Sequence, residues 1–245
     1  MKVEGSTALV TGANRGLGLS FAKALLALGA KKVYAAARNP ENVALKGVTA
    51  LKLDVTSDED AVEAARVASD VDLLINNAGI ALPGAFLAED AMDAARRQFE
   101  VNFFGPLRLA RAFAPILACN GGGAIVNVLS VASWMNGPML ATYGASKSAA
   151  WALTNGLRIE LAGQGTQLVG LHAGFIDTDL TRGIDAPKSA AEDIVRATLA
   201  ALERGDGQVL ADDVSRLVHQ GLSADNPVYF HSAAELRSQA AQPAA

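Results

Sequence analysis

The sequence predicts one α/β domain built on a doubly wound parallel sheet, and three observations carry that prediction. Short apolar runs alternate with longer helical patterns, which is typical of βαβ units. Several of these runs lack polar–apolar alternation, as expected for strands covered by helices on both faces. The 245 residues are 51% apolar and 19% charged, which is enough for one large core. We therefore expect a single domain over residues 1–245, with a frayed tail at 238–245.

The apolar runs and the segments between them give the expected elements in order. The strands are expected at Thr7–Val10, Lys32–Ala36, Thr49–Leu53, Val71–Ile75, Gly123–Val128, Gln167–Leu171 and Gln208–Leu210. The clearest helical patterns are Gly18–Leu28, Ser57–Ala68, Ala88–Leu117 and Tyr143–Ala162. Thr56 and Glu59 stand at the spacing of a capping box, which predicts a helix start at that point.

The charge and the cysteine content limit the possible partners. The formal net charge is −4 and the basic residues are scattered, which argues against nucleic acid and against an anionic membrane surface. Cys119 is the single cysteine, so neither an internal disulfide nor a multi-cysteine metal site is expected. No apolar run approaches the roughly 18 residues that span a bilayer, and the N-terminus lacks a signal-peptide core. We expect a cytoplasmic protein without a bound metal.

A glycine-rich turn follows the first expected strand and precedes a helix. Gly12, Gly16 and Gly18 have the spacing GxxxGxG, which differs from the GxGxxG fingerprint. Glycines permit a tight turn and a close approach of the backbone to a phosphate, while the helix start offers unpaired N–H groups and a favourable dipole. Chain reversal alone is the alternative, but the position of the turn between strand and helix favours dinucleotide binding in a Rossmann-type fold.

The end of the second expected strand predicts which dinucleotide is bound. An acidic residue there accepts from the ribose 2′-hydroxyl, whereas an arginine accommodates a 2′-phosphate. This strand ends in Ala37 and Arg38 without a carboxylate, and Arg15 lies in the glycine turn. Two guanidinium groups can pair with one phosphate, so the sequence favours NADP(H) over NAD(H). The alternative is that both arginines are solvated surface residues.

Tyr143 and Lys147 lie one turn apart on one face of an expected helix. A hydride added to a carbonyl carbon leaves an alkoxide that needs a proton, and a phenol with a pKa near 10 is a poor proton donor and acceptor at neutral pH. A nearby ammonium favours the phenolate and lowers that pKa. The pair therefore predicts exchange between carbonyl and alcohol, with Tyr143 as general acid/base.

In these motifs the chain resembles the classical short-chain dehydrogenase/reductase family. Four further segments match in the family's order, and the resemblance covers essentially the whole chain: Leu53-Asp54-Val55, Asn76-Asn77-Ala78-Gly79, Val101-Asn102 and Ile125-Val126-Asn127-Val128-Leu129-Ser130. The resemblance implies a Rossmann-type sheet of about seven strands, a small carbonyl or alcohol substrate and NADP(H). It also implies a homodimer or homotetramer, formed through the helices that include Phe99–Leu117 and Trp151–Leu161.

The resemblance assigns a role to each matching residue. Tyr143 would be the acid/base, Ser130 would hydrogen-bond the substrate oxygen, and Lys147 would hold the nicotinamide ribose and lower the pKa of Tyr143. Asn102 would bind a water that extends the proton relay, and Asp54 would accept from the adenine amino group. The alternatives are a strand-end hydroxyl bonded to the backbone for Ser130, an ordinary polar helix residue for Asn102, and a turn residue before a helix for Asp54. The other implied cofactor contacts are Gly12, Asn14, Arg15, Gly16, Leu17, Gly18, Arg38, Val55, Asn77, Ala78, Gly79, Gly174, Phe175, Ile176 and Thr178.

The loop after the sixth strand departs from the family's pattern. Ala173 stands where a proline usually precedes Gly174, which loosens the φ restriction of the loop. His172 is expected to be a strand-end side chain and not a base, because the Tyr/Lys pair already supplies proton transfer. Thr178 still matches the family's carboxamide contact.

The expected substrate pocket is mainly apolar, which favours a hydrophobic or aromatic ketone. A short lid between Asp179 and Ala190 would give a bulky substrate access. A sugar, steroid or acyl substrate is the alternative, as is a non-catalytic NADP-binding regulator on the same fold. The extended, sugar-nucleotide branch of the superfamily fits less well, because it usually carries a further C-terminal domain. The expected lining is Leu82, Ala132, Trp134, Met135, Met139, Leu140, Phe175 and Leu180.

Overall fold

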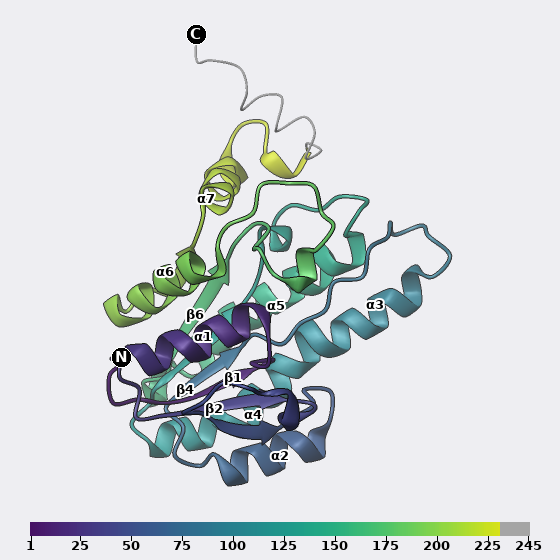
Figure 1. Cartoon of the computed structure of the whole chain (residues 1–245). Helices are drawn as coiled ribbons and strands as arrows, with labels where there is room; N and C mark the ends of the chain where they lie inside the picture. The colour runs from purple at the N-terminus through teal and green to yellow at the C-terminus, as the bar shows by residue number, and fades with distance from the viewer. Residues whose placement is uncertain (231–245) are drawn as a thin grey trace.

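The computed structural model describes residues 1–230 and shows a seven-stranded parallel sheet with helices on both faces (Figure 1). The strand order is β3-β2-β1-β4-β5-β6-β7, and every pairing is parallel. The chain runs outward from β1 to β3 and returns to β4 on the other side of β1. Open α/β sheets bind their ligands at such a switch point. The doubly wound sheet is confirmed; the tail expected at 238–245 lies outside the described residues.

All seven predicted strands are present, with small shifts at their ends. The strands are β1 Thr7–Thr11, β2 Lys32–Ala37, β3 Thr49–Lys52, β4 Leu73–Asn76, β5 Ala124–Val128, β6 Gln167–His172 and β7 Gln208–Leu210. The α-helices are α1 Gly16–Ala27, α2 Asp58–Val67, α3 Ala91–Phe99, α4 Gly105–Cys119, α5 Ala141–Glu160, α6 Ala191–Arg204 and α7 Asp213–Gln220.

Two apolar clusters cover the two faces of the sheet. Val10 of β1 packs in one cluster with Phe21 of α1 and residues of α6, whereas its neighbour Leu9 packs in the other with Phe113 of α4 and residues of α2 and α5. Successive strand residues point to opposite faces, so a strand buried on both sides must be apolar at every position. This arrangement explains why these runs lack alternation, and it holds the carboxyl ends of the strands in place.

The prediction of a single helix over Ala88–Leu117 is wrong. The structure has α3 and α4 separated by a π-helical turn at Glu100–Phe104. Pro106 has no N–H to donate to the carbonyl of Asn102, four residues earlier, so a regular α-helical ladder is interrupted there. Turns of this kind occur frequently at functional sites.

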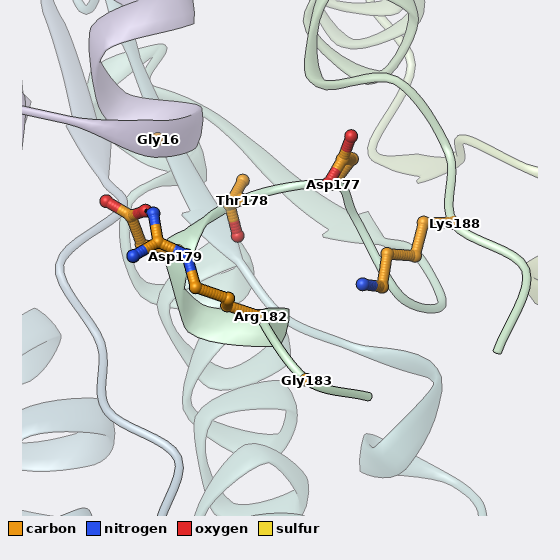
Figure 2. A pocket seen from close by; sticks show the side chains of 7 residues that line it. All are labelled: Gly16, Asp177, Thr178, Asp179, Arg182, Gly183 and Lys188. Atoms are coloured by element: carbon orange, nitrogen blue, oxygen red, sulfur yellow. Dashed lines mark hydrogen bonds and ion pairs between the residues drawn. The ribbon is translucent and has the colours of Figure 1, made fainter. Parts of the chain in front are cut away.

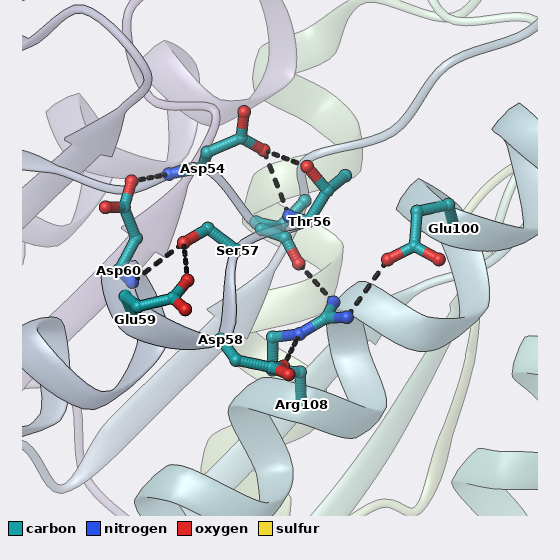
Figure 3. A network of polar contacts seen from close by, with 9 residues as sticks. Asp54, Thr56, Ser57, Asp58, Glu59, Asp60, Glu100 and Arg108 are labelled. Atoms are coloured by element: carbon teal, nitrogen blue, oxygen red, sulfur yellow. Dashed lines mark hydrogen bonds and ion pairs between the residues drawn. The ribbon is translucent and has the colours of Figure 1, made fainter.

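The capping box predicted from Thr56 and Glu59 is also wrong. Ser57 caps α2 instead, and its hydroxyl accepts from the N–H of Asp60 at 3.0 Å. Thr56 is held by Asp54, whose Oδ1 accepts from the Thr56 N–H at 3.0 Å and from its hydroxyl at 2.8 Å (Figure 3). This tight turn before the helix takes up the Thr56 side chain, so the helix begins one residue later.

No helix in the described part of the chain has the length and apolar character to cross a membrane. Within residues 1–230 there is also no group of three or more His, Cys, Asp or Glu side chains placed to hold a metal ion.

Candidate active site

The carboxyl edge of the sheet collects the residues that the motifs predicted. The glycine turn follows β1, residues 77–79 follow β4, Ser130 follows β5 and residues 174–178 follow β6. Since β1 and β4 flank the switch point, these loops meet where an open α/β sheet offers a crevice.

The glycine turn has the backbone geometry that its sequence predicts. Gly12 and Gly16 have φ values of 64° and 53°, in the left-handed region that glycine adopts most readily. A Cβ at Gly18 would overlap the carbonyl oxygen of Gly12 and lie 2.5 Å from Nδ2 of Asn77. Glycine at this position therefore lets α1 pack directly on the turn.

The start of α1 is fitted to an anion. Arg15 occupies the N-cap position without a side-chain cap hydrogen bond, and the first turn holds no acidic residue. The first N–H groups of a helix have no partner within the helix, and the helix dipole places partial positive charge there. These residues fit the diphosphate of a dinucleotide on the chemistry of their donors.

Hydrogen bonds hold the loop after β4 against the end of β1. The Thr11 hydroxyl accepts from the N–H groups of Asn77 and Ala78, both at 2.9 Å. The Asn77 side chain donates to the Thr11 carbonyl at 2.8 Å. Both Thr11 and the Asn77 amide are thus used to hold the turn, and the 77–79 backbone borders the crevice.

The π-helical turn places Asn102 beside Lys147. The Asn102 amide donates to the Ile80 carbonyl and to the Ser146 hydroxyl, both at 2.9 Å, and its oxygen accepts from the Ile80 N–H at 3.0 Å. A Cβ at Gly79 would lie 3.2 Å from Asn102 Oδ1 and 3.7 Å from Lys147 Nζ. The side chains of two residues predicted to be catalytic, Asn102 and Lys147, therefore both lie next to Gly79.

Lys147 is buried, and its ammonium donates to the Val128 carbonyl at 2.7 Å. Burial lowers the pKa of Lys147 to about 8, because removal from water disfavours the charged form. Its Nζ lies 5.8 Å from the ring centroid of Tyr143. The predicted proximity of Lys147 and Tyr143 is present.

The predicted lowering of the Tyr143 pKa is not present. Burial raises the pKa of Tyr143 to about 12, and the hydrogen bond with the Ser130 side chain acts in the opposite direction. The cost of burying a phenolate outweighs the effect of that hydrogen bond. The phenol therefore keeps its proton at neutral pH, and the raised pKa makes it a weaker acid than free tyrosine.

Ser130 follows β5, and its hydroxyl caps a short 3₁₀ turn by accepting from the Ala132 N–H at 3.1 Å. This bond uses a lone pair of the oxygen and leaves the hydroxyl proton to be donated. Ser130 thus has a structural contact and a free donor at once, beside the Tyr143 phenol.

His172 ends β6 and supports the Ser130 backbone. Its ring is fully buried, and Nδ1 lies 3.1 Å from the Ser130 carbonyl, which can only accept. The ring stacks on Trp134 with centroids 3.7 Å apart and an interplanar angle of 15°. Burial lowers the pKa of His172 to about 4, so the imidazole is neutral at physiological pH. A buried, neutral ring at the strand end agrees with the expected role.

The loop with Ala173 in place of proline is held by a residue that the motifs did not identify. Asp212 accepts from the Gly174 N–H at 2.8 Å and from the Ser189 hydroxyl at 3.3 Å. Its other oxygen accepts from the Ser215 N–H and caps α7. The capping-box spacing of Asp212 and Ser215 could have identified the helix start, but not the contact with Gly174.

The predicted nucleotide contacts lie on separate loops. Arg38 is exposed directly after β2, whereas Arg15 forms an ion pair with Asp179 at 3.8 Å. Asp54 uses one carboxylate oxygen for Thr56, and its other oxygen carries no contact in Figure 3. In the same network Arg108 joins α4 to the start of α2 and donates to the Val55 carbonyl at 2.7 Å. The Asp54 turn is therefore anchored from both sides.

The loops after β4 and β5 are joined on the substrate side. Gly84 donates to the Met139 carbonyl at 2.9 Å, and Ala141 donates to the Gly84 carbonyl at 3.1 Å. An apolar cavity of about 420 Å³ lies at this junction, beside the start of α5. Its lining comprises Ala85, Phe86, Leu87, Asn136, Gly137, Pro138 and Ala141.

The residues predicted to line the substrate pocket do not coincide with the lining of this cavity. None of them lines it directly, although Met139 and Leu140 belong to the loop that forms it. Trp134 packs in an aromatic cluster with His172 and Trp151. Leu180 is about half exposed on the loop after β6. Phe86 and Leu87, which stand close to Leu82 in the sequence, were not identified in advance.

A second cavity, of about 380 Å³, joins the glycine turn to the loop after β6 (Figure 2). Two of its residues, Arg182 and Lys188, were not identified from motifs. Both are basic residues close after Thr178, which is the signal that could have drawn attention to them. The complete lining is Gly16, Asp177, Thr178, Asp179, Arg182, Gly183 and Lys188.

A doubly wound sheet with a glycine-rich, uncapped helix start at its switch point defines a protein of the dinucleotide-binding Rossmann type. Residues 6–189 match the family model described as short chain dehydrogenase. The chain belongs to this family of oxidoreductases, as its motifs predicted.

Individual relatives cover nearly the whole chain. A short chain dehydrogenase from Burkholderia cenocepacia J2315, solved in complex with NADP, is 40% identical with a TM-score of 0.89, over 99% of this chain and 100% of that one. The 1-deoxy-11-beta-hydroxypentalenate dehydrogenase of Streptomyces exfoliatus is 32% identical, over 94% of this chain and 84% of that protein. The gluconate 5-dehydrogenase of Gluconobacter oxydans is 36% identical, over 81% of this chain and 82% of that protein.

Proposed function

We propose that this protein is an NADP(H)-dependent alcohol dehydrogenase or carbonyl reductase. It transfers a hydride between the nicotinamide and a carbonyl or secondary alcohol carbon, with Tyr143 as general acid/base. The observation that carries the proposal is the grouping of Tyr143, Ser130 and Lys147 at the sheet edge that also holds the glycine turn.

The chain's own residues handle the proton. The Ser130 hydroxyl donates to the substrate oxygen and orients it, and the Tyr143 phenol gives its proton to that oxygen. A pKa of about 12 keeps the phenol protonated at neutral pH. The Lys147 ammonium, with a pKa of about 8, is charged at pH 7 and stabilises the phenolate that remains. The bound cofactor would supply the hydride. These protonation states favour reduction at neutral pH, and oxidation as the pH rises.

The preference for NADP(H) rests on three features of this chain. Arg38 follows β2 directly, no carboxylate stands at the strand end, and Arg15 lies in the turn. The similar structure from Burkholderia cenocepacia, with NADP bound, supports the same choice. The backbone around Gly12 and Gly16 would hold the diphosphate, and the free oxygen of Asp54 would accept from the adenine. We expect NADPH to bind at least about tenfold more tightly than NADH, the gain of roughly one charge-assisted contact.

The substrate is proposed to be a hydrophobic or aromatic ketone, or the corresponding alcohol. The apolar cavity at Phe86, Leu87 and Pro138 lies beside the start of the helix that carries Tyr143, which supports an apolar substrate. A ketone panel that includes an acetophenone-like compound and a charged sugar tests this choice. Faster turnover of the sugar would refute it.

The decisive experiment follows NADPH absorbance with that panel for the native protein and for Tyr143→Phe. The variant should bind NADPH with unchanged affinity and lose at least about a thousandfold in turnover, because general acid/base catalysis supplies effects of that size. Retained turnover in Tyr143→Phe would exclude the assigned role. A native protein that binds NADPH but reduces no carbonyl would instead be a non-catalytic regulator.

The protein is also proposed to form a homodimer or homotetramer through α4 and α5. Ile159 on α5 is 80% exposed, and Phe104, just before α4, is 44% exposed. Apolar side chains at these positions would be covered by a second copy. Sedimentation of the native protein tests this, and a monomer at micromolar concentration would refute it.

A further inference from the structure

The cavity between the glycine turn and the loop after β6 contains two cations that the proposed mechanism does not use. We call residues 177–190 the β6 loop. Arg182 and Lys188 of this loop line the same cavity as Gly16 at the start of α1. Figure 2 shows the Arg182 guanidinium beside Asp179, and the Lys188 side chain extending toward the segment of Thr178 and Arg182.

The lining of this cavity holds two cations and two carboxylates, and Arg15 of the glycine turn lies next to it. Asp179 pairs with both Arg15, at 3.8 Å, and Arg182. Lys188 has no ion pair within residues 1–230. Asp177 also lines the cavity and forms no ion pair within the described residues. The lining is therefore balanced in charge, and Arg15 together with the start of α1 adds positive charge beside it.

The base of the β6 loop is clasped by backbone hydrogen bonds. Ser189 donates to the Phe175 carbonyl at 2.8 Å, and Asp177 donates to the Ser189 carbonyl at 2.9 Å. A Cβ at Gly16 would lie 3.5 Å from Cβ of Thr178, so the loop sits directly against the glycine turn. The loop's cations are therefore held near the N–H groups at the start of α1.

We propose that Arg182 and Lys188 bind the diphosphate of the dinucleotide from the side opposite the start of α1, and that Asp179 is the counter-ion of Arg182 until the diphosphate arrives. This inference rests on the proposed function. The helix start can satisfy one side of the diphosphate, whose remaining oxygens carry negative charge that matches a guanidinium and an ammonium. The β6 loop then closes over the cofactor because its cations bind it.

The test measures dissociation constants by NADPH fluorescence titration for the native protein, Arg182→Ala, Lys188→Ala and Lys188→Gln. Each variant should weaken NADPH binding about tenfold, the size expected for a lost charge-assisted hydrogen bond. A second probe, adenosine 2′-monophosphate, has the 2′-phosphate but no diphosphate, and its affinity should not change. Arg38→Ala should instead weaken the binding of both NADPH and adenosine 2′-monophosphate, because both carry the 2′-phosphate.

Arg196→Ala is the matched control. Arg196 pairs with Asp193 at i,i+3 on the exposed side of α6, as Arg182 pairs with Asp179, and it does not line the cavity. It should leave both affinities unchanged. Unchanged NADPH binding in the Arg182 and Lys188 variants would overturn the inference, as would an equal loss for adenosine 2′-monophosphate. A native protein that binds no NADPH at all would overturn the proposed function itself.

Discussion

Two regions at the same edge of the sheet are stabilised in opposite ways. The catalytic cluster, comprising Ser130, Tyr143, Lys147, Asn102 and Ser146, is tied by hydrogen bonds between buried groups. The β6 loop presents its charges to solvent, and the Arg15–Asp179 pair has side chains that are 70% and 39% exposed. Losing a buried partner costs about 1–3 kcal/mol, whereas an exposed ion pair is worth about 0–1 kcal/mol.

This difference fits the two tasks. A proton must pass between atoms held at fixed positions, so the catalytic cluster is built from contacts that are costly to break. A cofactor must enter and leave, so the β6 loop uses weak pairs that a phosphate can replace. Four predictions test the comparison, beginning with the largest effect.

Lys147→Met should change how stability depends on pH. The pKa of Lys147 falls from 10.5 to about 8 on folding, so the unfolded chain binds more protons between these values and native stability rises with pH there. A shift of this size corresponds to about 3 kcal/mol. The stability margin of the variant over the native protein should therefore shrink by roughly 2–3 kcal/mol between pH 7 and pH 10.

Urea unfolding of both proteins from pH 7 to pH 10 measures this margin, and groups other than Lys147 cancel in the difference. The range stops at pH 10, because above it the titration of Tyr143 lowers the stability of both proteins. Parallel stability curves would mean that the Lys147 ammonium is not buried at a cost.

Asn102→Ala should destabilise the fold by about 2–3 kcal/mol, because it leaves the Ile80 backbone groups and the Ser146 hydroxyl without their partner. Asn120→Ala is the control, since the exposed Asn120 also donates to two carbonyls, those of Ser69 and Val71. Its loss should cost less than about 1 kcal/mol, because water can replace the donor. Equal losses in urea unfolding would remove the distinction between buried and exposed contacts.

Asp212→Ala should cost about 1 kcal/mol through the lost cap of α7 and should also weaken NADPH binding, because Gly174 loses its anchor. Ser57→Ala provides the comparison: it removes the side-chain cap of α2, far from residues 174–178. That variant should lose similar stability and keep its affinity. If both variants bind NADPH like the native protein, Asp212 does not position the loop.

Asp179→Asn should change stability by less than about 0.5 kcal/mol, since its pairs are exposed. It should nevertheless tighten NADPH binding about twofold at low salt, because the carboxylate no longer competes for Arg15 and Arg182. Asp193→Asn, on the matched pair of α6, should have no such effect. Weaker binding by Asp179→Asn would contradict the role of Asp179 as a counter-ion.

The interpretation from sequence was most accurate where neighbouring residues carry the information. The runs at Thr7–Val10 and Gln167–Leu171 predicted β1 and β6 because strands buried on both faces are apolar at every position. The turn at Gly12 and the spacing of Tyr143 and Lys147 were also read correctly, since backbone conformation and helical periodicity depend on a few consecutive residues.

One error arose where distant parts of the chain compete with local preference, and the other arose from a turn within the same segment. The helix over Ala88–Leu117 is interrupted where Asn102 bonds Ile80 and Ser146, the latter 44 residues away. Thr56 lost the cap to Ser57 because the Asp54 turn holds it. The contacts of Asn102 are not visible in the spacing of residues along one segment, whereas the Asp54–Thr56 turn is local and competed with the predicted cap.

The sequence by itself determined the strand positions, the glycine turn, the Tyr143–Lys147 spacing and the family. Only the tertiary structure decided how deeply those side chains are buried, and hence why the Tyr143 pKa is raised to about 12 instead of lowered. It also decided that Asp212 holds Gly174, 38 residues earlier, and that Arg182 and Lys188 face the start of α1. Solvent exclusion and long-range contacts depend on how the whole chain packs, whereas strand, turn and helix patterns depend on a few consecutive residues.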